Sequence, residues 1–133
     1  MRVVLDTNIF ISGIFWGGIP NKIILEWKNK SFILISSLET INELIRVLKD
    51  FKIRLDDEII DTWIDLITTN SEIVLIEDKL DIVKNDKSDN KFLETAEIGQ
   101  ADYLITQDDH LLNIKEYKNI KILTPLEFLK ILK

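Results

Sequence analysis

Two aspartates stand where apolar segments of the chain end, and they are the first candidates for chemistry. Asp6 follows Val3–Leu5, and Asp108 follows the apolar segment 103–106. An ionised carboxylate at the end of a buried strand costs several kcal/mol unless it is paired or bound to a metal ion. If both strands belong to one open sheet, the two carboxylates can converge, and their mutual repulsion makes a cation the simplest partner.

Each of these aspartates also has a purely structural interpretation. Asp6 could cap a turn that includes Thr7 and Asn8, because short polar side chains favour such turns. Asp108 could be the N-cap of a helix that begins at Asp109. The residues alone leave metal binding and capping equally open.

Two further acidic residues, Glu43 and Asp89, lie on or before predicted helices. Glu43 falls outside the apolar stripe of its helix, so periodicity does not select it, and a solvated glutamate is the ordinary interpretation. Asp89 precedes a helix predicted from Lys91 and could be only its N-cap. Both residues are therefore candidates that spacing alone does not establish.

The composition limits which metal could bind. The chain of 133 residues has no cysteine and one histidine, His110. Thiolate nucleophiles, disulfides, cysteine-based metal sites and multi-histidine zinc sites are therefore excluded. Any metal must be held mainly by carboxylate oxygens, which points to Mg²⁺ or Mn²⁺. His110 is predicted to be a partly exposed polar residue.

The charge balance bears on partners. With 23 acidic and 17 basic residues, the formal net charge of −6 would repel nucleic acid if it were evenly spread. The basic residues gather in two stretches, 28–54 and 84–91, and either could form a local basic rim. Solvated helix faces explain most of them, so no single basic residue is selected.

Apolar runs and helical periodicity predict the elements. Five strands are predicted, at Val3–Leu5, Phe32–Ile35, Ile73–Ile76, Tyr103–Thr106 and Ile120–Leu123. Helices are predicted from 19, after 36, over 56–70, over 91–99 and from 125. Ser36 with Glu39, and Thr124 with Glu127, have the spacing of a capping box, and Gly99 suits a helix C-terminus.

This alternation predicts a three-layer α/β/α fold with a mostly parallel sheet of about five strands flanked by helices. The chain has no linker or repeat, so a single domain over 1–133 is expected. Ligands of open parallel sheets bind beyond the carboxyl ends of the strands. That edge is where the pattern places Asp6 and Asp108.

Several blocks of the chain resemble the PIN-domain family. Residues 3–8 (VVLDTN) are similar to the family's opening motif, and residues 88–96 (SDNKFLETA) and 101–108 (ADYLITQD) to its third and fourth blocks. The order and spacing of the blocks match along the whole chain. Residues 122–129 (ILTPLEFL) are similar to a prokaryotic branch whose members are often toxins of toxin–antitoxin pairs.

The resemblance implies an Mg²⁺- or Mn²⁺-dependent endoribonuclease with a PIN-like fold, whose products carry 5′-phosphate and 3′-hydroxyl ends. The implied metal ligands and catalytic residues are Asp6, Glu43, Asp89 and Asp108. Asn8 and Thr106 are implied as hydrogen-bonding neighbours, and Asp86 as an extra ligand or a substrate contact.

The expected partners are an RNA substrate, a cognate antitoxin and a second copy of the chain in a homodimer. Phe15 and Trp16, beside Gly17–Gly18, would suit an interface unless both rings pack into the core. No secretion signal and no apolar run of membrane-spanning length is visible, so a cytoplasmic protein without a membrane partner is expected.

Two other functions are compatible with the same fold and the same acidic residues. A PIN-fold module that binds nucleic acid or regulates without cutting is one, although all four acidic positions are filled. A small-molecule phosphatase is the other, but it usually needs paired aspartates two residues apart after the first strand. Asn8 occupies the second of those places.

Overall fold

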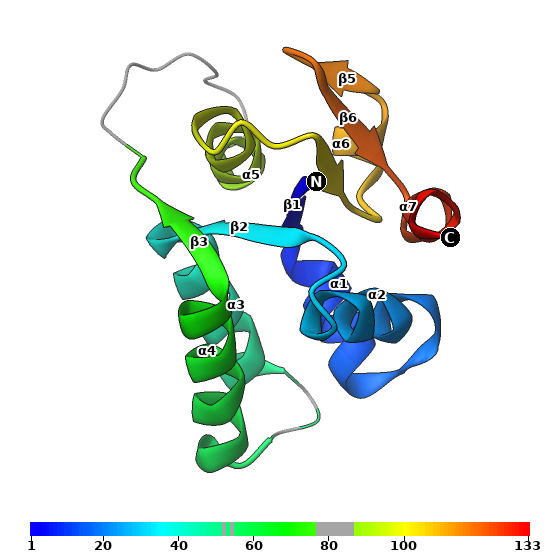
Figure 1. The fold of residues 1–133 in the computed structure, drawn as a ribbon. Helices are drawn as coiled ribbons and strands as arrows, with labels where there is room; N and C mark the ends of the chain where they lie inside the picture. Colours follow the sequence, from blue (N-terminus) through cyan, green and yellow to red (C-terminus); the bar gives the residue numbers. More distant parts are fainter. Residues whose placement is uncertain (52, 54, 77–86) are drawn as a thin grey trace.

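The computed structural model describes residues 1–51, 53, 55–76 and 87–133, with the backbone alone for 87–90. Strands and helices alternate along these residues (Figure 1). The strands are β1 (Arg2–Leu5), β2 (Ile33–Ser37), β3 (Ser71–Val74), β4 (Tyr103–Ile105), β5 (Glu116–Tyr117) and β6 (Ile120–Leu123). The helices are α1 (Thr7–Phe15), α2 (Gly18–Lys28), α3 (Leu38–Asp50), α4 (Asp57–Asn70), α5 (Lys87–Ile98), α6 (Asp109–Leu112) and α7 (Pro125–Leu132).

The strands form one sheet in the order β3-β2-β1-β4-β6-β5. Strands β1, β2, β3, β4 and β6 run parallel, which confirms the predicted mostly parallel sheet. Strand β5 pairs antiparallel with β6 and is absent from the prediction. It is two residues long, and Lys118 and Asn119 close the turn with left-handed backbone conformations (φ 48° and 70°).

The order of the strands places a topological switch point beside β1. From β1 the chain moves outward through β2 to β3, and then returns to add β4 on the other side of β1. In register, Leu5 pairs with Ile105, so β1 and β4 end together. A ligand site is expected at this point of an open parallel sheet.

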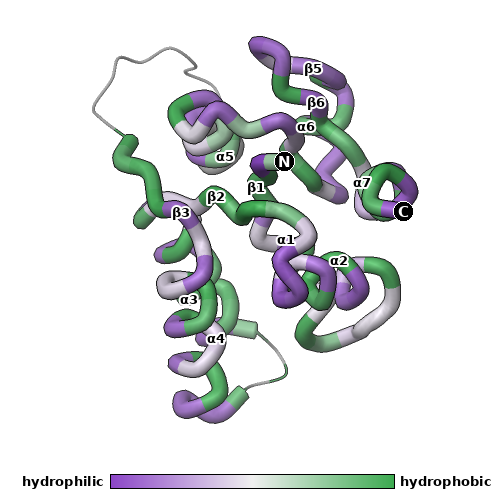
Figure 2. Tube along the Cα trace, viewed as in Figure 1, coloured by the Kyte–Doolittle hydropathy of each residue, from purple (hydrophilic) through white to green (hydrophobic). Residues whose placement is uncertain are grey.

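Helices cover both faces of the sheet, as the three-layer prediction required. On β1, Val3 and Leu5 face a core shared with α1, α2, α3, α4 and α7, whereas Val4 faces a smaller core under α5 and α6. Figure 1 shows these two sets of helices on opposite sides of the sheet. In Figure 2 strand β2 is largely hydrophobic, while hydrophobic and hydrophilic residues alternate along the helices.

Several helix boundaries follow their local signals. Helix α4 has the predicted extent, and Thr124 and Glu127 form the predicted capping box at the start of α7. The predicted box of Ser36 and Glu39 is wrong. Ser37 is the N-cap of α3 and exchanges hydrogen bonds with Thr40, because β2 continues through Ser37 in register with β3.

One helix is missing from the sequence prediction, and two predicted elements begin earlier in the structure. Helix α1 was not predicted, and it begins directly after Asp6. Strand β3 lies two residues earlier than predicted, because Ser71 pairs with Leu34 as soon as α4 ends. Helix α5 begins at Lys87 rather than at Lys91. Among the helices in the described part of the chain, none is long and apolar enough to span a membrane.

Gly99 follows α5. A glycine is needed there because the helix end packs closely on β2, and not because the backbone is left-handed. The left-handed residue at this helix end is Gln100 (φ 53°), and the N–H of Ala101 donates to the carbonyl of Ala96. A Cβ on Gly99 would clash with the Cγ2 of Ile35 and lie 3.1 Å from the carbonyl oxygen of Thr95. The glycine therefore lets α5 approach β2.

We expect Gly99→Ala to lower the free energy of unfolding by about 1–3 kcal/mol, because Ile35 is held in a buried strand and cannot yield. Urea denaturation monitored by circular dichroism measures this change. Gln100→Gly is the control and should leave stability equal or raise it by up to about 1 kcal/mol, because it relieves a left-handed residue. Equal stability of Gly99→Ala and the wild type would contradict the packing argument.

Candidate active site

Asp6 lies at the switch point, between the end of β1 and the start of α1. Its backbone N–H donates to the carbonyl of Ile105 at 3.0 Å, and its own carbonyl accepts from the N–H of Ile9 at 2.9 Å. These bonds join Asp6 to the neighbouring strand and to the first turn of α1. The residue is 5% exposed, so its carboxylate has little contact with water.

Thr106 connects Asp6 to Asp108. The hydroxyl of Thr106 donates to Oδ2 of Asp6 at 2.6 Å and accepts from the backbone N–H of Asp108 at 3.0 Å. A hydroxyl has one proton to donate, so these two bonds set its orientation. Thr106 is fully buried, and the segment after β4 is thereby held against the carboxylate that ends β1.

Glu43 reaches the same region from α3. Its Oε2 accepts from the hydroxyl of Thr7 at 2.7 Å, and its Oε1 accepts from Nζ of Lys91 at 2.8 Å. Because Thr7 is the residue after Asp6, this contact brings Glu43 next to the end of β1. Sequence periodicity did not select Glu43, and its two partners lie 36 and 48 residues away in the chain.

Burial of Asp6 raises the pKa of its carboxyl above the usual value. Hydrogen bonds from the Thr106 hydroxyl and the Thr7 backbone act in the opposite direction, and the negative charges of Glu43 and Asp108 raise the pKa further. The three carboxyls therefore share one electrostatic environment. The ionised form of Asp6 is therefore less favourable in the folded protein than in water.

Asp108 caps α6, as its structural interpretation proposed. Its side chain accepts from the backbone N–H of His110 at 3.2 Å, and α6 is only four residues long. Capping and metal binding are compatible because a carboxylate has two oxygens with several acceptor sites. His110 is exposed on the same short helix.

The structure describes the remaining predicted site residues only in part. Asp86 lies outside the described residues. Asp89 lies in the first turn of α5, so it is not the N-cap of a helix from Lys91 as one interpretation held, and its side chain is outside the description. Asn8 is exposed at the second position of α1. The structure thus brings together Asp6, Glu43, Thr106 and Asp108.

The carboxylate oxygens of this site are the ligands that a hard divalent cation prefers, and one of these carboxylates, Asp6, is buried. Among the side chains that the structure describes, however, no three acidic or histidine groups come close enough to hold one ion together. Both oxygens of Glu43 are engaged by Thr7 and Lys91. Each of these oxygens keeps a further acceptor site, but the positive charge of Lys91 opposes a second cation there, so closing a metal site would require Lys91 to withdraw from Glu43 or Asp89 to contribute.

Two residues of this arrangement were missed at the sequence level. Thr7 was treated as part of a turn, although a hydroxyl beside Asp6 is suited to orient a second carboxylate. In the sequence Lys91 stands out only as the predicted start of a helix, as one basic residue of the stretch 84–91 and as part of the 88–96 block. No sequence pattern marks it as the partner of Glu43, since the pairing depends on how α3 and α5 pack.

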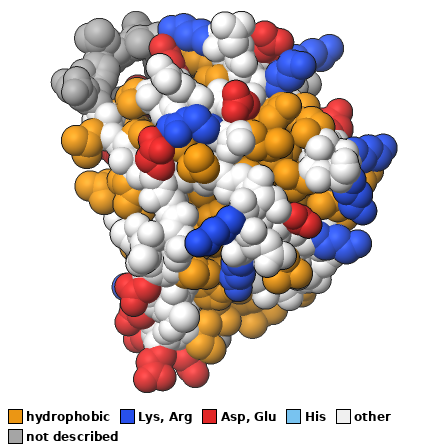
Figure 3. Space-filling model, viewed as in Figure 1, with side chains coloured by type: hydrophobic (Ala, Val, Ile, Leu, Met, Phe, Trp, Pro, Cys, Tyr) orange, Lys and Arg blue, Asp and Glu red, His pale blue; other side chains and the backbone are white. Residues whose placement is uncertain are grey.

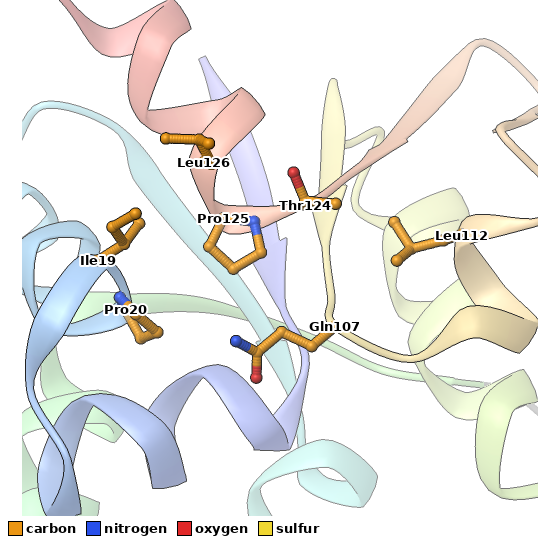
Figure 4. Close-up of a pocket in the computed structure, with 7 residues that line it drawn as sticks. All are labelled: Ile19, Pro20, Gln107, Leu112, Thr124, Pro125 and Leu126. Carbon is orange, nitrogen blue, oxygen red and sulfur yellow. The ribbon is translucent and has the colours of Figure 1, made fainter.

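An apolar pocket of about 420 Å³ opens beside these residues. Side chains of α2, the β4–α6 segment and the start of α7 line it (Figure 4). Gln107, which precedes Asp108, belongs to it and accepts a hydrogen bond from the hydroxyl of Ser12 at 3.3 Å. Asp6, Glu43 and Asp108, the acidic site residues whose side chains are described, do not line this pocket, so it is distinct from them.

The two aromatic residues considered for an interface behave differently. Phe15 stacks on Phe51 with ring centroids 4.4 Å apart and packs against the larger core. Trp16 is 66% exposed and precedes Gly17 and Gly18, which both adopt left-handed conformations. Only Trp16 therefore keeps the surface position that an interface needs.

The surface charges are mixed on the face drawn in Figure 3. Acidic side chains gather at the lower end of that view. Asp56, Asp57 and Glu58, at the start of α4, are all exposed. Elsewhere on this face, lysines and arginines lie among the acidic residues.

Comparison with protein families places the chain in a known family. A family model described as a PIN domain matches residues 2–110. The matched interval contains β1 to β4, and with them all the acidic residues of the candidate site. No curated protein matches the chain.

We expect Asp6→Asn to raise the free energy of unfolding of the metal-free protein at pH 7 by about 1 kcal/mol. Because the folded-state pKa of Asp6 is raised, the folded protein binds the proton more tightly, and stability falls as pH rises from the unfolded pKa through the folded one. The gain should therefore disappear at acidic pH, where wild-type Asp6 is already protonated.

Chemical denaturation of wild type and variant between pH 4 and pH 8, in the presence of a chelator, measures this difference. Asp61→Asn removes the same charge from an exposed position on α4 and should give no such pH-dependent gain. A variant that is less stable than wild type at every pH would show that Asp6 serves mainly as a structural acceptor.

Proposed function

The chain belongs to the PIN domain family, and on that premise we propose that it is an endoribonuclease that uses Mg²⁺ or Mn²⁺. PIN domains are generally metal-dependent nucleases, so cleavage of nucleic acid by hydrolysis is the general activity of the fold. RNA as the substrate and internal cleavage are the specific parts of the proposal.

The observation that carries the proposal is the buried carboxylate of Asp6 under the negative field of two other acidic residues. Such a group gains most from a bound cation, because the cation replaces repulsion with attraction. Asp6, Glu43, Asp89 and Asp108 are the proposed ligands. When bound, the divalent cation would supply Lewis-acid chemistry, activating water and neutralising phosphate charge.

Other residues of the chain would position these ligands. Thr106 donates to Asp6 and keeps one carboxylate oxygen fixed, while Thr7 does the same for Glu43. Exposed Asn8, at the start of α1, is proposed to contact the substrate, as is Asp86. Attack by water on the phosphodiester would leave 5′-phosphate and 3′-hydroxyl ends.

A more specific proposal is that the chain is the toxin of a toxin–antitoxin pair and acts on cytoplasmic RNA. Its support is the likeness of residues 122–129 to the toxin branch; these residues end β6 and begin α7. Exposed Trp16 is the proposed contact for an antitoxin or for a second copy of the chain.

The alternative is a PIN-fold module that binds nucleic acid without cutting it. The ion pair between Lys91 and Glu43 favours this alternative, because it engages one of the proposed ligands. The following experiment separates the two functions.

We expect the purified protein to cleave single-stranded RNA with Mg²⁺ or Mn²⁺ and to lose this activity in a chelator. Asp6→Asn and Asp108→Asn should each lower the cleavage rate by at least about 100-fold, because each removes a charged ligand. Gel analysis of labelled RNA measures the rate. Asparagine is also a good N-cap, so Asp108→Asn should keep α6 capped and leave stability unchanged.

Mg²⁺ should also raise the melting temperature of the wild type, and raise it far less in either variant, because a ligand of the folded state stabilises it. RNA binding without cleavage at any metal concentration would support the non-cleaving module. Cleavage by both variants at the wild-type rate would remove the aspartates from the site.

If the chain is a toxin, induced expression should arrest bacterial growth, and co-expression of the protein encoded by the neighbouring gene should restore it. Trp16→Ala should weaken the complex by about tenfold or more, since exposed aromatic anchors contribute strongly to interfaces. Growth curves and light scattering of the co-purified proteins test this. Unaffected growth together with a strictly monomeric chain would contradict the toxin proposal.

A further inference from the structure

The ion pair between Lys91 and Glu43 is the least exposed of the pairs found among the described residues. The side chains of Lys91 and Glu43 are 22% and 13% exposed, whereas those of Lys118 and Glu97 are 58% and 41% exposed. A pair shielded from water interacts more strongly, and losing one partner leaves the other charge poorly solvated. This pair is therefore expected to contribute to the stability of the metal-free protein.

Buried hydroxyls hold both partners of this pair in place. The hydroxyl of Thr95 donates to the carbonyl of Lys91 at 2.6 Å and lies 2.9 Å from the hydroxyl of Ser37. Ser37 in turn caps α3 by accepting from the N–H of Thr40, one turn before Glu43. The start of α3 is thus joined to α5 one turn after Lys91, and the ammonium is directed at the carboxylate.

In this arrangement the ammonium of Lys91 occupies an acceptor site of Oε1 of Glu43 and places a positive charge beside an oxygen that a metal ion would use. Thr7 engages Oε2 of Glu43 and Lys91 engages Oε1, while no three acidic groups in the described part of the chain converge on one point. Two cations cannot both have full use of one carboxylate, because they repel each other and share its acceptor sites. Lys91 and a divalent cation therefore compete for Glu43.

We propose that Lys91 is a positioning residue that acts as the internal counter-cation of the metal-free site. It neutralises Glu43 when no metal is bound, and Glu43 passes from Lys91 to the divalent cation when the site is loaded. The proposal rests on the proposed function, because it assigns Glu43 as a ligand. It adds that this chain regulates its own metal affinity through a lysine on α5.

The test measures binding of Mn²⁺ itself, without RNA, by calorimetry or by the electron paramagnetic resonance signal of free Mn²⁺. Lys91→Met should bind Mn²⁺ about tenfold more tightly than wild type, as expected from removing a unit positive charge beside a divalent ion. Lys118→Met is the matched control, since it removes the same charge from an exposed lysine–glutamate pair. Its affinity for Mn²⁺ should stay within about twofold of wild type.

A second measurement identifies the exchange of partners. Without metal, Lys91→Met should melt several degrees below wild type, because Glu43 loses its cation. With saturating Mn²⁺ this difference should vanish, because Glu43 no longer depends on Lys91. A merely structural ion pair would lower the melting temperature equally with and without Mn²⁺. If Lys91→Met fails to fold, Lys91→Gln, which keeps a hydrogen-bond donor, should show the same tighter binding of Mn²⁺.

The outcomes separate the two proposals. Wild-type protein that binds Mn²⁺, with unchanged or weaker binding in the Lys91 variants, would overturn the role of Lys91 and leave the metal-dependent function standing. Wild-type protein that binds no Mn²⁺ would overturn both. Tighter binding that appears equally in Lys118→Met would assign the effect to net charge and would also overturn the role of Lys91.

Discussion

The structure depends on one unfavourable placement, the burial of a carboxylate where the central strand ends. Asp6 is held there by backbone bonds to β4 and α1, so it cannot move into water without disrupting the sheet edge. Hydrogen bonds from the Thr106 hydroxyl and the Thr7 backbone offset part of the cost of burying this charge. The negative charges of Glu43 and Asp108 add to it. A buried carboxylate whose acidic neighbours raise its pKa is the expected signature of a functional site.

The fold explains how residues distant in sequence meet around Asp6. Parallel pairing of β1 with β4 aligns Leu5 with Ile105, and the segment after β4 then supplies Thr106 and Asp108. Helices α3 and α5 approach the same edge from the two faces of the sheet, and each contributes one member of the Glu43–Lys91 pair. Gly99 allows α5 to lie against β2, so the packing of a helix end also determines where Lys91 can reach.

Much of this organisation could be predicted from sequence, because it depends on local patterns. Apolar strands, the α4 periodicity and the capping box at Thr124 and Glu127 each have a signature within a few residues. Helix α1 has no such local signature. Its β-branched and aromatic residues are buried on several sides, so they form no clean apolar stripe in the sequence. The two-residue strand β5 exists only because β6 is there to pair with it.

The candidate site could be predicted only in part, because some of its residues meet only through tertiary packing. Asp6 and Asp108 follow strands and could be placed at one edge from the sheet order alone. Glu43 required the family resemblance, because its partners come from other elements, and Lys91 was visible only once α3 and α5 were packed.

A crystal structure of the protein soaked in Mn²⁺, with the ion located by its anomalous scattering, would show directly whether a metal ion binds at Asp6. We expect an ion bound by Asp6 and Glu43, with Nζ of Lys91 displaced from Oε1 of Glu43. An ion bound elsewhere, or no ion at saturating Mn²⁺ while the Lys91–Glu43 pair stays intact, would contradict it.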